Sequence, residues 1–446
     1  RIPKRIRRRE RNSIMGFIPY DRHGEEFEAA RLENLKKTVR HAMDNSGLYR
    51  AKFEKAGITP GDIKSLDDLK HLPLLDKEDL KSDYPLALKC VDDEKIVRIH
   101  GSSGTTGKRK ILCYTQKDID VWADMFARCY ELAGLTRQDR VHIAVGYGLW
   151  TAGAGFQLGC ERFGAMAVPL GPVNTDMHIE MLVDMQSTVF CSTASMALLM
   201  AEEIKKRNLF GHINLRKIIL GAERHGRAMR RRIQELTGVK EIYDIYGMTE
   251  AYGPGTGLDC GFHEGIHFWD DLFVYEVIDP VTLEPLPDGT EGELVITSLV
   301  KEAAPLIRYR THDMTQKIPG DCRCGVPFPR HGRITGRSDD MFIYRAVNIY
   351  PAQVDYILSG IDGISSEYQI YLDHKADGRD MMTIHVERDE IVSCDNNGVL
   401  CQTVSDKIRR KLLVRAEVVI KDPDTLPRTR RKSRRVFDNR DKNDNE

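Results

Sequence analysis

His100-Gly-Ser-Ser-Gly-Thr-Thr-Gly-Lys108 is the most informative stretch of the sequence, with three glycines, four hydroxyl side chains and one lysine after its first residue. It follows a predicted strand and leads into the strand-like residues 111–114. Backbone N–H groups of such a loop can surround an anion, while the hydroxyls and Lys108 add donors and a positive charge. It is not a Walker A loop, because five residues instead of four separate Gly101 from Gly107. The stretch therefore predicts a phosphate-binding turn between two strands.

On the C-terminal side of this loop, short β-branched runs alternate with amphipathic stretches. The pattern predicts strands at residues 141–145, 166–170, 188–191, 217–220 and 241–245, and helices at residues 116–133, 176–185, 195–207 and 228–236. On its N-terminal side, residues 25–55 have helical spacing that is interrupted at Gly47 and ends at Gly57. Alternating strands and helices are typical of parallel sheets with helices on their faces.

The helical pattern stops after about residue 253. Strands predicted at residues 273–278, 292–298 and 306–310 then alternate with turns, which indicates an antiparallel module over about residues 253–335. A separate set of β and α patterns begins near Gly336. We therefore expect an α/β protein with a large N-terminal domain, residues 1–336, and a small α+β domain, residues 337–446.

Composition excludes several classes of protein. The 446 residues carry 67 basic and 67 acidic side chains, so binding nucleic acid is not expected to be the main task. The uncharged residues 141–160 are broken by glycines, which excludes a transmembrane helix. Ten scattered cysteines are typical of reduced thiols in a cytoplasmic protein. We expect no membrane partner, a solvated basic tail at residues 1–11, and a chain that could form a homodimer.

Further motifs follow the glycine-rich loop in order: Gly221-Ala-Glu223, Tyr243-Asp-Ile-Tyr-Gly-Met-Thr-Glu250, Arg308-Tyr-Arg-Thr-His-Asp313, Gly336-Arg-Ser-Asp-Asp-Met341 and Lys432. Together they resemble the adenylate-forming enzymes, which include the acyl-CoA synthetases. Asn348-Ile-Tyr-Pro-Ala-Gln and the opening helices are similar, more narrowly, to the phenylacetate-CoA ligase family, over about residues 20–440. The resemblance implies ATP, Mg²⁺, coenzyme A and an aryl acid as small-molecule partners, and a small domain that is mobile.

Activating a carboxylate with ATP requires a site that balances much negative charge, and the motifs contain suitable groups. Glu250 offers a hard oxygen for Mg²⁺, and Thr249 could contact the α-phosphate. The resemblance implies catalytic roles for Lys108 and Lys432 and a hinge at Asp339. It also implies that the nucleotide is bound by Ser102, Ser103, Gly104, Thr105, Thr106, Gly107, Gly221, Ala222, Glu223, Tyr246, Gly247, Asp313 and Arg337.

The glycine-rich stretch around Tyr147 is the expected pocket for the acid. Aromatic and small residues there leave room for a flat ring, and we expect the pocket to be lined by Tyr147, Gly148, Trp150 and Gly153. By resemblance, Ala346 lies on the coenzyme A tunnel, where relatives have glycine. Arg431, next to Lys432, and His312 also replace glycines. These departures put thioester formation in more doubt than adenylation.

A second group of residues suggests a metal. Cys260, His267, Cys322 and Cys324 would make a tetrahedral Cys₃His zinc site that joins two distant segments, with His263 as a rival ligand. His263-Glu-Gly-Ile-His267 also matches the H-E-x-x-H signature of zinc peptidases, which requires a helix. Gly265 interrupts the motif, so a loop and a structural site are expected instead.

The sequence predicts an ATP-dependent aryl acid:CoA ligase that works through an acyl-adenylate and releases AMP, with phenylacetate as the expected acid and phenylacetate catabolism as its setting. Three alternatives remain open. The enzyme could stop at aryl-AMP or, like coenzyme F390 synthetases, transfer AMP to another acceptor. A degenerate member could bind nucleotide or acyl-CoA as a sensor. The most remote alternative is a zinc peptidase.

Overall fold

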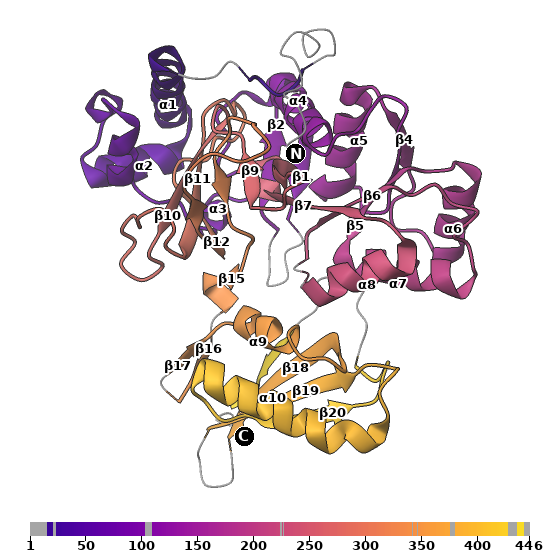
Figure 1. Cartoon of the computed structure of the whole chain (residues 1–446). Helices are drawn as coiled ribbons and strands as arrows, with labels where there is room; N and C mark the ends of the chain where they lie inside the picture. The colour runs from indigo at the N-terminus through magenta and orange to yellow at the C-terminus, as the bar shows by residue number, and fades with distance from the viewer. Residues whose placement is uncertain are drawn as a thin grey trace.

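The computed structural model describes residues 16–20, 24–102, 109–223, 225, 227–340, 342–345, 347–374, 380–426 and 435–440. Helices and sheets of the first three quarters of the chain form one large body, and the last quarter forms a smaller one beside it (Figure 1). Several expected site residues lie outside the described residues: Ser103, Gly104, Thr105, Thr106, Gly107, Lys108, Ala346 and Lys432.

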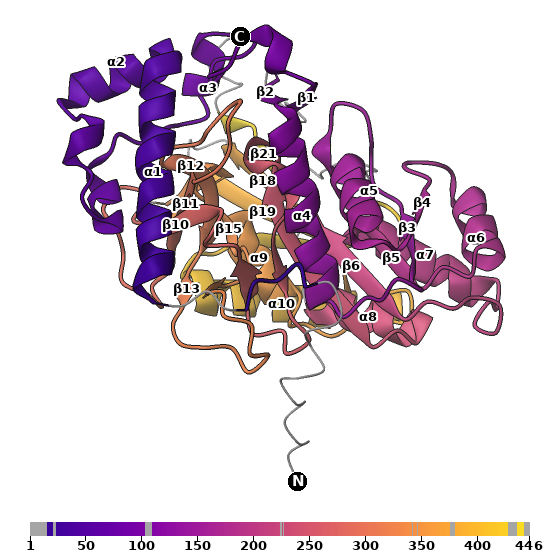
Figure 2. The same cartoon turned by 90° about the horizontal axis from the view of Figure 1, so that it is seen from above.

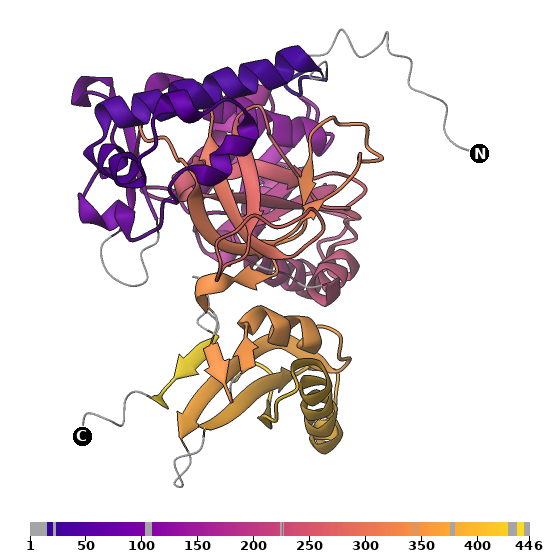
Figure 3. The same cartoon turned by 90° about the vertical axis from the view of Figure 1, so that its left-hand side faces the viewer.

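The chain opens with two helices, as their sequence pattern predicts. α1 (Glu25–Asn45) lies across the top of the large body (Figure 3), and α2 (Gly47–Ala56) follows after a break. The Ser46 side chain accepts the N–H of Tyr49 and caps α2, and Gly57 ends it with φ 68°, a left-handed conformation that suits glycine. Short helices then lead to the first strand: η2 (Pro60–Asp62), η3 (Leu66–His71), α3 (Asp79–Ser82) and η4 (Asp93–Lys95).

A nine-stranded sheet forms the centre of the large body, in the order β13-β14-β9-β8-β7-β6-β5-β3-β4. Its parallel half confirms the predicted α/β class: β3 (Arg140–Ile143), β4 (Met166–Pro169), β5 (Val189–Thr193), β6 (Lys217–Gly221) and β7 (Glu241–Met248). Helix α4 (Gln116–Leu132) precedes β3, and the helices between the strands are α5 (Thr151–Phe163), α6 (Thr175–Asp184), α7 (Ala194–Lys206) and α8 (Arg227–Thr237).

Helix α5 occupies a stretch in which the sequence pattern predicts no helix. It runs beside α4 (Figure 2) and places glycines at the contact. A Cβ on Gly155 would lie 2.9 Å from the ring of Trp122, and one on Gly159 would lie 2.6 Å from Phe126. The glycines that weaken helix propensity therefore let two helices pack at short distance, and tertiary contact overrides propensity.

The predicted antiparallel module is divided between two sheets. β8 (Gly253–Asp259), β9 (Ile266–Phe268), β13 (Lys317–Ile318) and β14 (Arg330–His331) extend the nine-stranded sheet. The remaining strands form a four-stranded antiparallel sheet: β10 (Phe273–Ile278), β11 (Gly292–Ser298), β12 (Tyr309–Thr315) and β15 (Gly336–Arg337). A hairpin of β1 (Arg98–Gly101) and β2 (Ile111–Tyr114) flanks the glycine-rich loop.

The strand predicted at residues 306–310 is wrong by about three residues, since β12 begins at Tyr309. The N–H groups of Leu306, Ile307 and Arg308 bond to side chains, namely Ser298, Tyr49 and Thr297. Arg308 also has φ 47°, outside the extended region. An apolar run in this position is buried without being a strand.

The small body has its own core. Its sheet has the order β20-β19-β18-β21, with β18 (Ile364–His374), β19 (Asp380–Arg388), β20 (Glu417–Lys421) and β21 (Val436–Asp438). α9 (Pro351–Leu358) and α10 (Asn397–Leu412) pack on this sheet, and β16 (Phe342–Tyr344) and β17 (Val347–Ile349) form a hairpin near the join. No helix within the described ranges is both long and apolar enough to cross a membrane.

Candidate active site

Glu250 is the centre of the site. It lies in η5 (Thr249–Ala251), directly after β7, and is 3% exposed. Lys110, just before β2, forms an ion pair with its Oε1, and the Tyr309 hydroxyl donates to the same oxygen at 3.1 Å. Burial alone would raise the pKa of Glu250, but Lys110 and Tyr309 hold it below its ordinary value. The carboxylate is therefore ionised beside the strand that follows the glycine-rich loop.

Side chains also fix the backbone of this turn. The Tyr114 hydroxyl donates to the Thr249 carbonyl at 3.1 Å, and Lys301 Nζ donates to the Glu250 carbonyl at 2.9 Å. Lys301 is buried, and its ammonium lies 4.7 and 4.8 Å from the ring centres of Tyr114 and Tyr252. Burial lowers the pKa of Lys301 to about 8. The turn is thus held in one conformation before any substrate binds.

A second carboxylate lies on β12. Asp313 accepts the Tyr246 hydroxyl at 2.8 Å and Nη1 of Arg337 at 3.0 Å. Arg337 also donates through Nε and Nη2 to Asp339 at 2.8 and 3.0 Å. Four of the residues expected to bind the nucleotide or form the hinge therefore make a chain of direct contacts, in the order Tyr246, Asp313, Arg337 and Asp339.

Glycines in β6 and β7 allow neighbouring parts of the chain to approach closely. A Cβ on Gly221 would lie 2.7 Å from Ile245, and one on Gly247 would lie 2.0 Å from the Gly253 carbonyl. Ala222 has φ 65°, which turns the chain sharply. Glu223 accepts the N–H and hydroxyl of Ser195 at 2.9 and 2.6 Å, so its carboxylate organises the turn.

The expected acid pocket lies at the start of α5. The Tyr147 ring packs on Gly153, where a Cβ would approach it to 2.6 Å, and Trp150 is the N-cap residue of the helix. Gly148 has φ 82°, a left-handed conformation. Burial raises the pKa of Tyr147 to about 12. Within the described residues, its buried hydroxyl has no hydrogen-bond partner.

Four candidate zinc ligands are brought together. The ligand atoms of Cys260, His267, Cys322 and Cys324 lie within 4.8 Å of one another. Cys260 and Cys322 sulfurs are 3.6 Å apart, close to the about 3.8 Å that two thiolates reach around tetrahedral zinc. Hydrogen bonding with Cys324 lowers the pKa of Cys260. His267 Nδ1 contacts the Phe328 carbonyl at 2.9 Å, which leaves Nε2 to face the sulfurs.

The rival ligand His263 lies elsewhere, since its Nδ1 pairs with Asp259 at 2.8 Å. The H-E-x-x-H segment is not helical: His263 has φ 54°, Gly265 has φ 116°, and His267 lies in β9. Glu264 forms an ion pair with Arg323. The peptidase alternative is therefore wrong, because both histidines and the glutamate cannot share one helix face.

The sequence motifs assigned no role at the site to three residues that the structure places there. Lys110, Tyr309 and Lys301 all contact Glu250 or its turn. Lys110 lies two residues after Lys108, the lysine that the sequence analysis selected. Its position next to the glycine-rich loop was the sequence signal that could have identified it. Lys301 follows a buried strand by only three residues, which is an unusual place for a charge.

Comparison with known proteins identifies the class. The AMP-binding enzyme family matches residues 30–299, and the AMP-binding enzyme C-terminal domain matches residues 346–440. The chain belongs to the AMP-binding enzyme family, and it is an AMP-forming acid–CoA ligase. It is 40% identical to phenylacetate-coenzyme A ligase of Pseudomonas putida, over 92% of this chain and 93% of that one. It is 38% identical to phenylacetate-coenzyme A ligase of Escherichia coli strain K12, over 93% and 95%.

Solved structures of one ligase also indicate which domain arrangement this chain has. The 2-hydroxyisobutyryl-CoA ligase in the postadenylation state matches with a TM-score of 0.84 at 28% identity, covering 93% of this chain and 90% of that one. The same ligase in the thioesterification state matches over the same shares with a TM-score of only 0.68. Since the coverage is equal, the two domains here are arranged more as in the postadenylation state.

Proposed function

We propose that this protein is an ATP-dependent phenylacetate–CoA ligase, which joins the acid to coenzyme A through an acyl-adenylate. The observation that carries the proposal is the ion pair of Glu250 with Lys110, because it places an ionised, buried carboxylate beside the strand that leaves the glycine-rich loop. Mg²⁺ binds hard oxygens, and we infer that Glu250 would hold it near the phosphates of ATP.

In the first half-reaction, an oxygen of the acid attacks the α-phosphorus of ATP, and pyrophosphate leaves with the electrons of the broken P–O bond. Negative charge develops on the phosphoryl oxygens, so fixed donors lower the barrier. We assign this task to Thr249, Lys110 and the glycine-rich loop, with Lys432 from the small domain. Asp313 would accept the ribose hydroxyls in place of its bonds to Tyr246 and Arg337.

In the second half-reaction, the thiolate of coenzyme A attacks the acyl carbon, and AMP leaves. A sulfur–carbon bond forms and the bond to the phosphate oxygen breaks, so no redox partner is needed. By resemblance to the family, we assign Ala346 to the path of coenzyme A and Asp339 to the hinge about which the small domain would turn. The finer proposal of coenzyme A as acceptor depends on these two positions.

Selection of an aryl acid rests on the pocket at the start of α5. The Tyr147 ring packs against Gly153 and Gly171, where a Cβ would lie 2.6 and 3.1 Å from it, so the two glycines let the ring take this position. Aromatic rings pack favourably against such a wall. The names of the relatives, phenylacetate-coenzyme A ligases, support the same acid.

We further propose a structural zinc at Cys260, His267, Cys322 and Cys324. Three sulfurs and one imidazole are a preferred donor set for zinc, and the backbone carbonyl of Phe328 orients His267. Bound there, zinc would supply a crosslink between β9 and the loop before β14, and no chemistry. We also propose a reducing compartment such as the cytoplasm, because ten cysteines scattered along the chain are typical of a protein without a disulfide framework.

Exchange of pyrophosphate into ATP over a panel of aryl and aliphatic acids, with and without coenzyme A, tests the function. Phenylacetate should be among the best acids, and Glu250→Gln should lower its exchange by about a hundredfold. Glu284→Gln, at an exposed position, is the control. Exchange without any acid, or none across the panel, would exclude adenylation. Exchange without thioester would favour another acceptor.

A further inference from the structure

A segment of the N-terminal helical part lies against the join between the two domains. Leu75 runs parallel to the start of β12: its N–H donates to the Arg308 carbonyl at 3.0 Å, and its carbonyl accepts the N–H of Arg310 at 2.8 Å. These backbone bonds fix the next two residues, Asp76 and Lys77, beside the end of the large body.

Lys77 reaches the expected hinge residue. Its Nζ donates to Asp339 Oδ2 at 2.6 Å, across 262 positions of sequence. Asp339 lies in η6 (Ser338–Asp340), between the last strand of the large body and the hairpin of the small one. Burial opposes its ionisation, but Arg337 and Lys77 hold the pKa of Asp339 well below its usual range. The carboxylate is thus an anion shared by two cations.

The two cations differ in what they connect. Arg337 is only two residues from Asp339, so this contact is local and says little about the rest of the molecule. Arg337 also bonds to Asp313, where the ribose is expected, so nucleotide binding competes for it. Lys77 belongs to a different part of the chain. It therefore adds a second link between the hinge and the large body, from a segment far away in the sequence.

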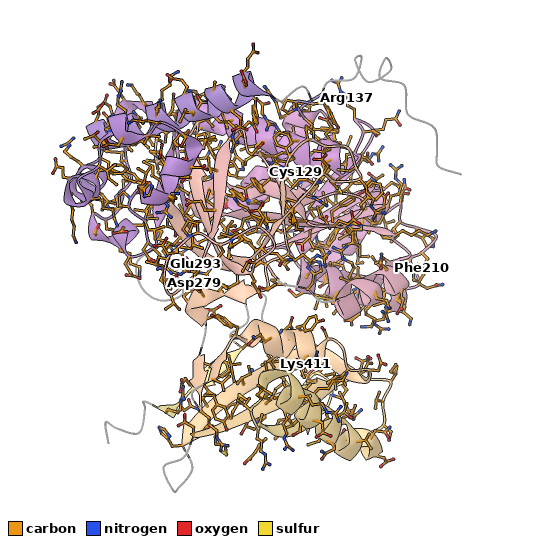
Figure 4. The ribbon with its side chains drawn as sticks, turned by 60° about the vertical axis from the view of Figure 1, so that its left-hand side comes forward. Cys129, Arg137, Phe210, Asp279, Glu293 and Lys411 are labelled. Carbon is orange, nitrogen blue, oxygen red and sulfur yellow. The ribbon has the colours of Figure 1, made fainter. Side chains whose placement is uncertain are left out.

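A polar cluster holds the neighbouring residue in the same way. Ser338 Oγ donates to Glu293 at 2.7 Å and lies 3.1 Å from His312 Nδ1. His312 Nε2 in turn is 3.1 Å from Asp76. Figure 4 places Glu293 on the side of the large body that faces the small one. Residues 76–77 therefore support two consecutive residues of η6.

We propose that Lys77 is a positioning residue, which holds Asp339 in the orientation seen here and so retains the small domain in the arrangement that is similar to the postadenylation state. The inference rests on the proposed two-step function, because only then must the small domain turn about Asp339. Turning changes the direction of the Asp339 side chain and breaks its bond to Lys77. The N-terminal helical part thereby sets the balance between the two half-reactions.

Lys77→Met tests this by measuring the half-reactions separately, as acid-dependent pyrophosphate exchange and as thioester formation from supplied phenylacetyl-adenylate. The ratio of the first rate to the second should fall about two- to fivefold, the effect of one partly exposed ion pair. Lys81→Met is the matched control, because Lys81 is a nearby lysine paired only locally with Glu78 in the contacts described. An unchanged ratio, or an equal fall in Lys81→Met, would overturn the proposal.

A double-mutant cycle separates positioning from general stability. In an Asp339→Asn background the added effect of Lys77→Met should disappear, since the bond is already lost. Additive effects would show that Lys77 acts elsewhere and would overturn the proposal.

A readout independent of chemistry completes the test. Energy transfer between dyes on the exposed Cys394 of the small domain and on Phe210→Cys of the large body reports the domain arrangement without substrate. Lys77→Met should shift the transfer efficiency, and an unchanged efficiency would overturn the proposal that Lys77 positions the small domain. If no acid supports exchange, the proposed function fails, and this signal alone then decides whether Lys77 holds the domains.

Discussion

His312 shows how a residue other than glycine can be accommodated in a left-handed conformation. It has φ 62°, a left-handed conformation that glycine adopts most readily. The imidazole lies between Asp76 and Glu293, at 3.1 and 3.6 Å. Burial alone would lower the pKa of His312, but the two carboxylates raise it to about 9, while the pKa values of both acids fall to about 2. His312 is therefore a buried cation, and its two carboxylate contacts offset the strain of its left-handed backbone.

His312→Asn should therefore cost stability in a pH-dependent way, and asparagine tolerates the left-handed backbone. A pKa raised on folding stabilises the protein fully below the unfolded value of about 6.5 and less as pH rises through about 9. The difference in unfolding free energy between the wild type and His312→Asn should be about 2 to 3 kcal/mol at pH 6 and shrink between about pH 6.5 and 9. Urea unfolding at a series of pH values measures it. A constant difference would show that His312 is not charged.

The ordered motifs named candidate residues for the site, but they could not predict the contacts of those residues. Glu250, Asp313, Arg337 and Asp339 follow from ordered motifs, and the structure brings the last three into contact. Lys110 was missed because a strand's period of two cannot say which lysine after a loop points inward. Motif spacing also could not decide whether His263 or His267 is the metal ligand, whereas the structure places His267 beside the cysteines and His263 beside Asp259.

At the scale of elements, the packing of α4 on α5 depends on glycines that sequence patterns treat as helix breakers. Gly159→Ala adds a Cβ that would lie 2.6 Å from Phe126, so the helices must separate. We expect it to lower the free energy of unfolding by about 1 to 3 kcal/mol, despite the better helix propensity of alanine. Gly398→Ala in α10 is the control, since its Cβ would meet nothing within 4 Å. Denaturant unfolding compares them, and equal stabilisation of both variants would contradict close packing.

The candidate zinc site is also a contact between elements. Metal analysis of protein purified without added zinc should give about one equivalent per chain, and chelation should lower the melting temperature before it stops pyrophosphate exchange. Cys322→Ser should lose the metal, whereas Cys394→Ser, at an exposed thiol outside the cluster, should keep it. Less than about 0.2 equivalents in the wild type would argue against a closed tetrahedral site.

Element types were more predictable than element boundaries. The parallel strands β3 to β7 and their helices follow from hydrophobic periodicity, whereas β12 begins later than predicted because side chains satisfy the N–H groups of residues 306–308. Helix α5 could not be predicted, since its helical state depends on the surface of α4. Long-range packing decided both cases.

For the whole molecule, the proposed function requires the two domains to work in sequence, and Lys432 gives the sharpest test of that proposal. Lys432→Ala should slow adenylation by about a hundredfold or more, because charge on the phosphates is then less stabilised. Conversion of supplied phenylacetyl-adenylate to thioester should stay nearly intact. Single-turnover kinetics of each half-reaction measure this, with Arg434→Ala as the control in the same basic run. Equal loss in both steps would show that the small domain does not alternate.

The hydrogen bonds of the opening helices have a consequence for how the protein is made. Thr38 donates to the Leu299 carbonyl at 3.0 Å and Tyr49 to the Pro305 carbonyl at 2.8 Å, partners about 260 and 256 positions later. Synthesis proceeds at roughly 5 to 20 residues per second. The residues that bond to the first helices are therefore made more than about ten seconds after the helices themselves. Their apolar faces stay exposed on the ribosome in that interval. A nascent chain halted before residue 299 should be held by chaperones, and one released beyond about residue 310 should not.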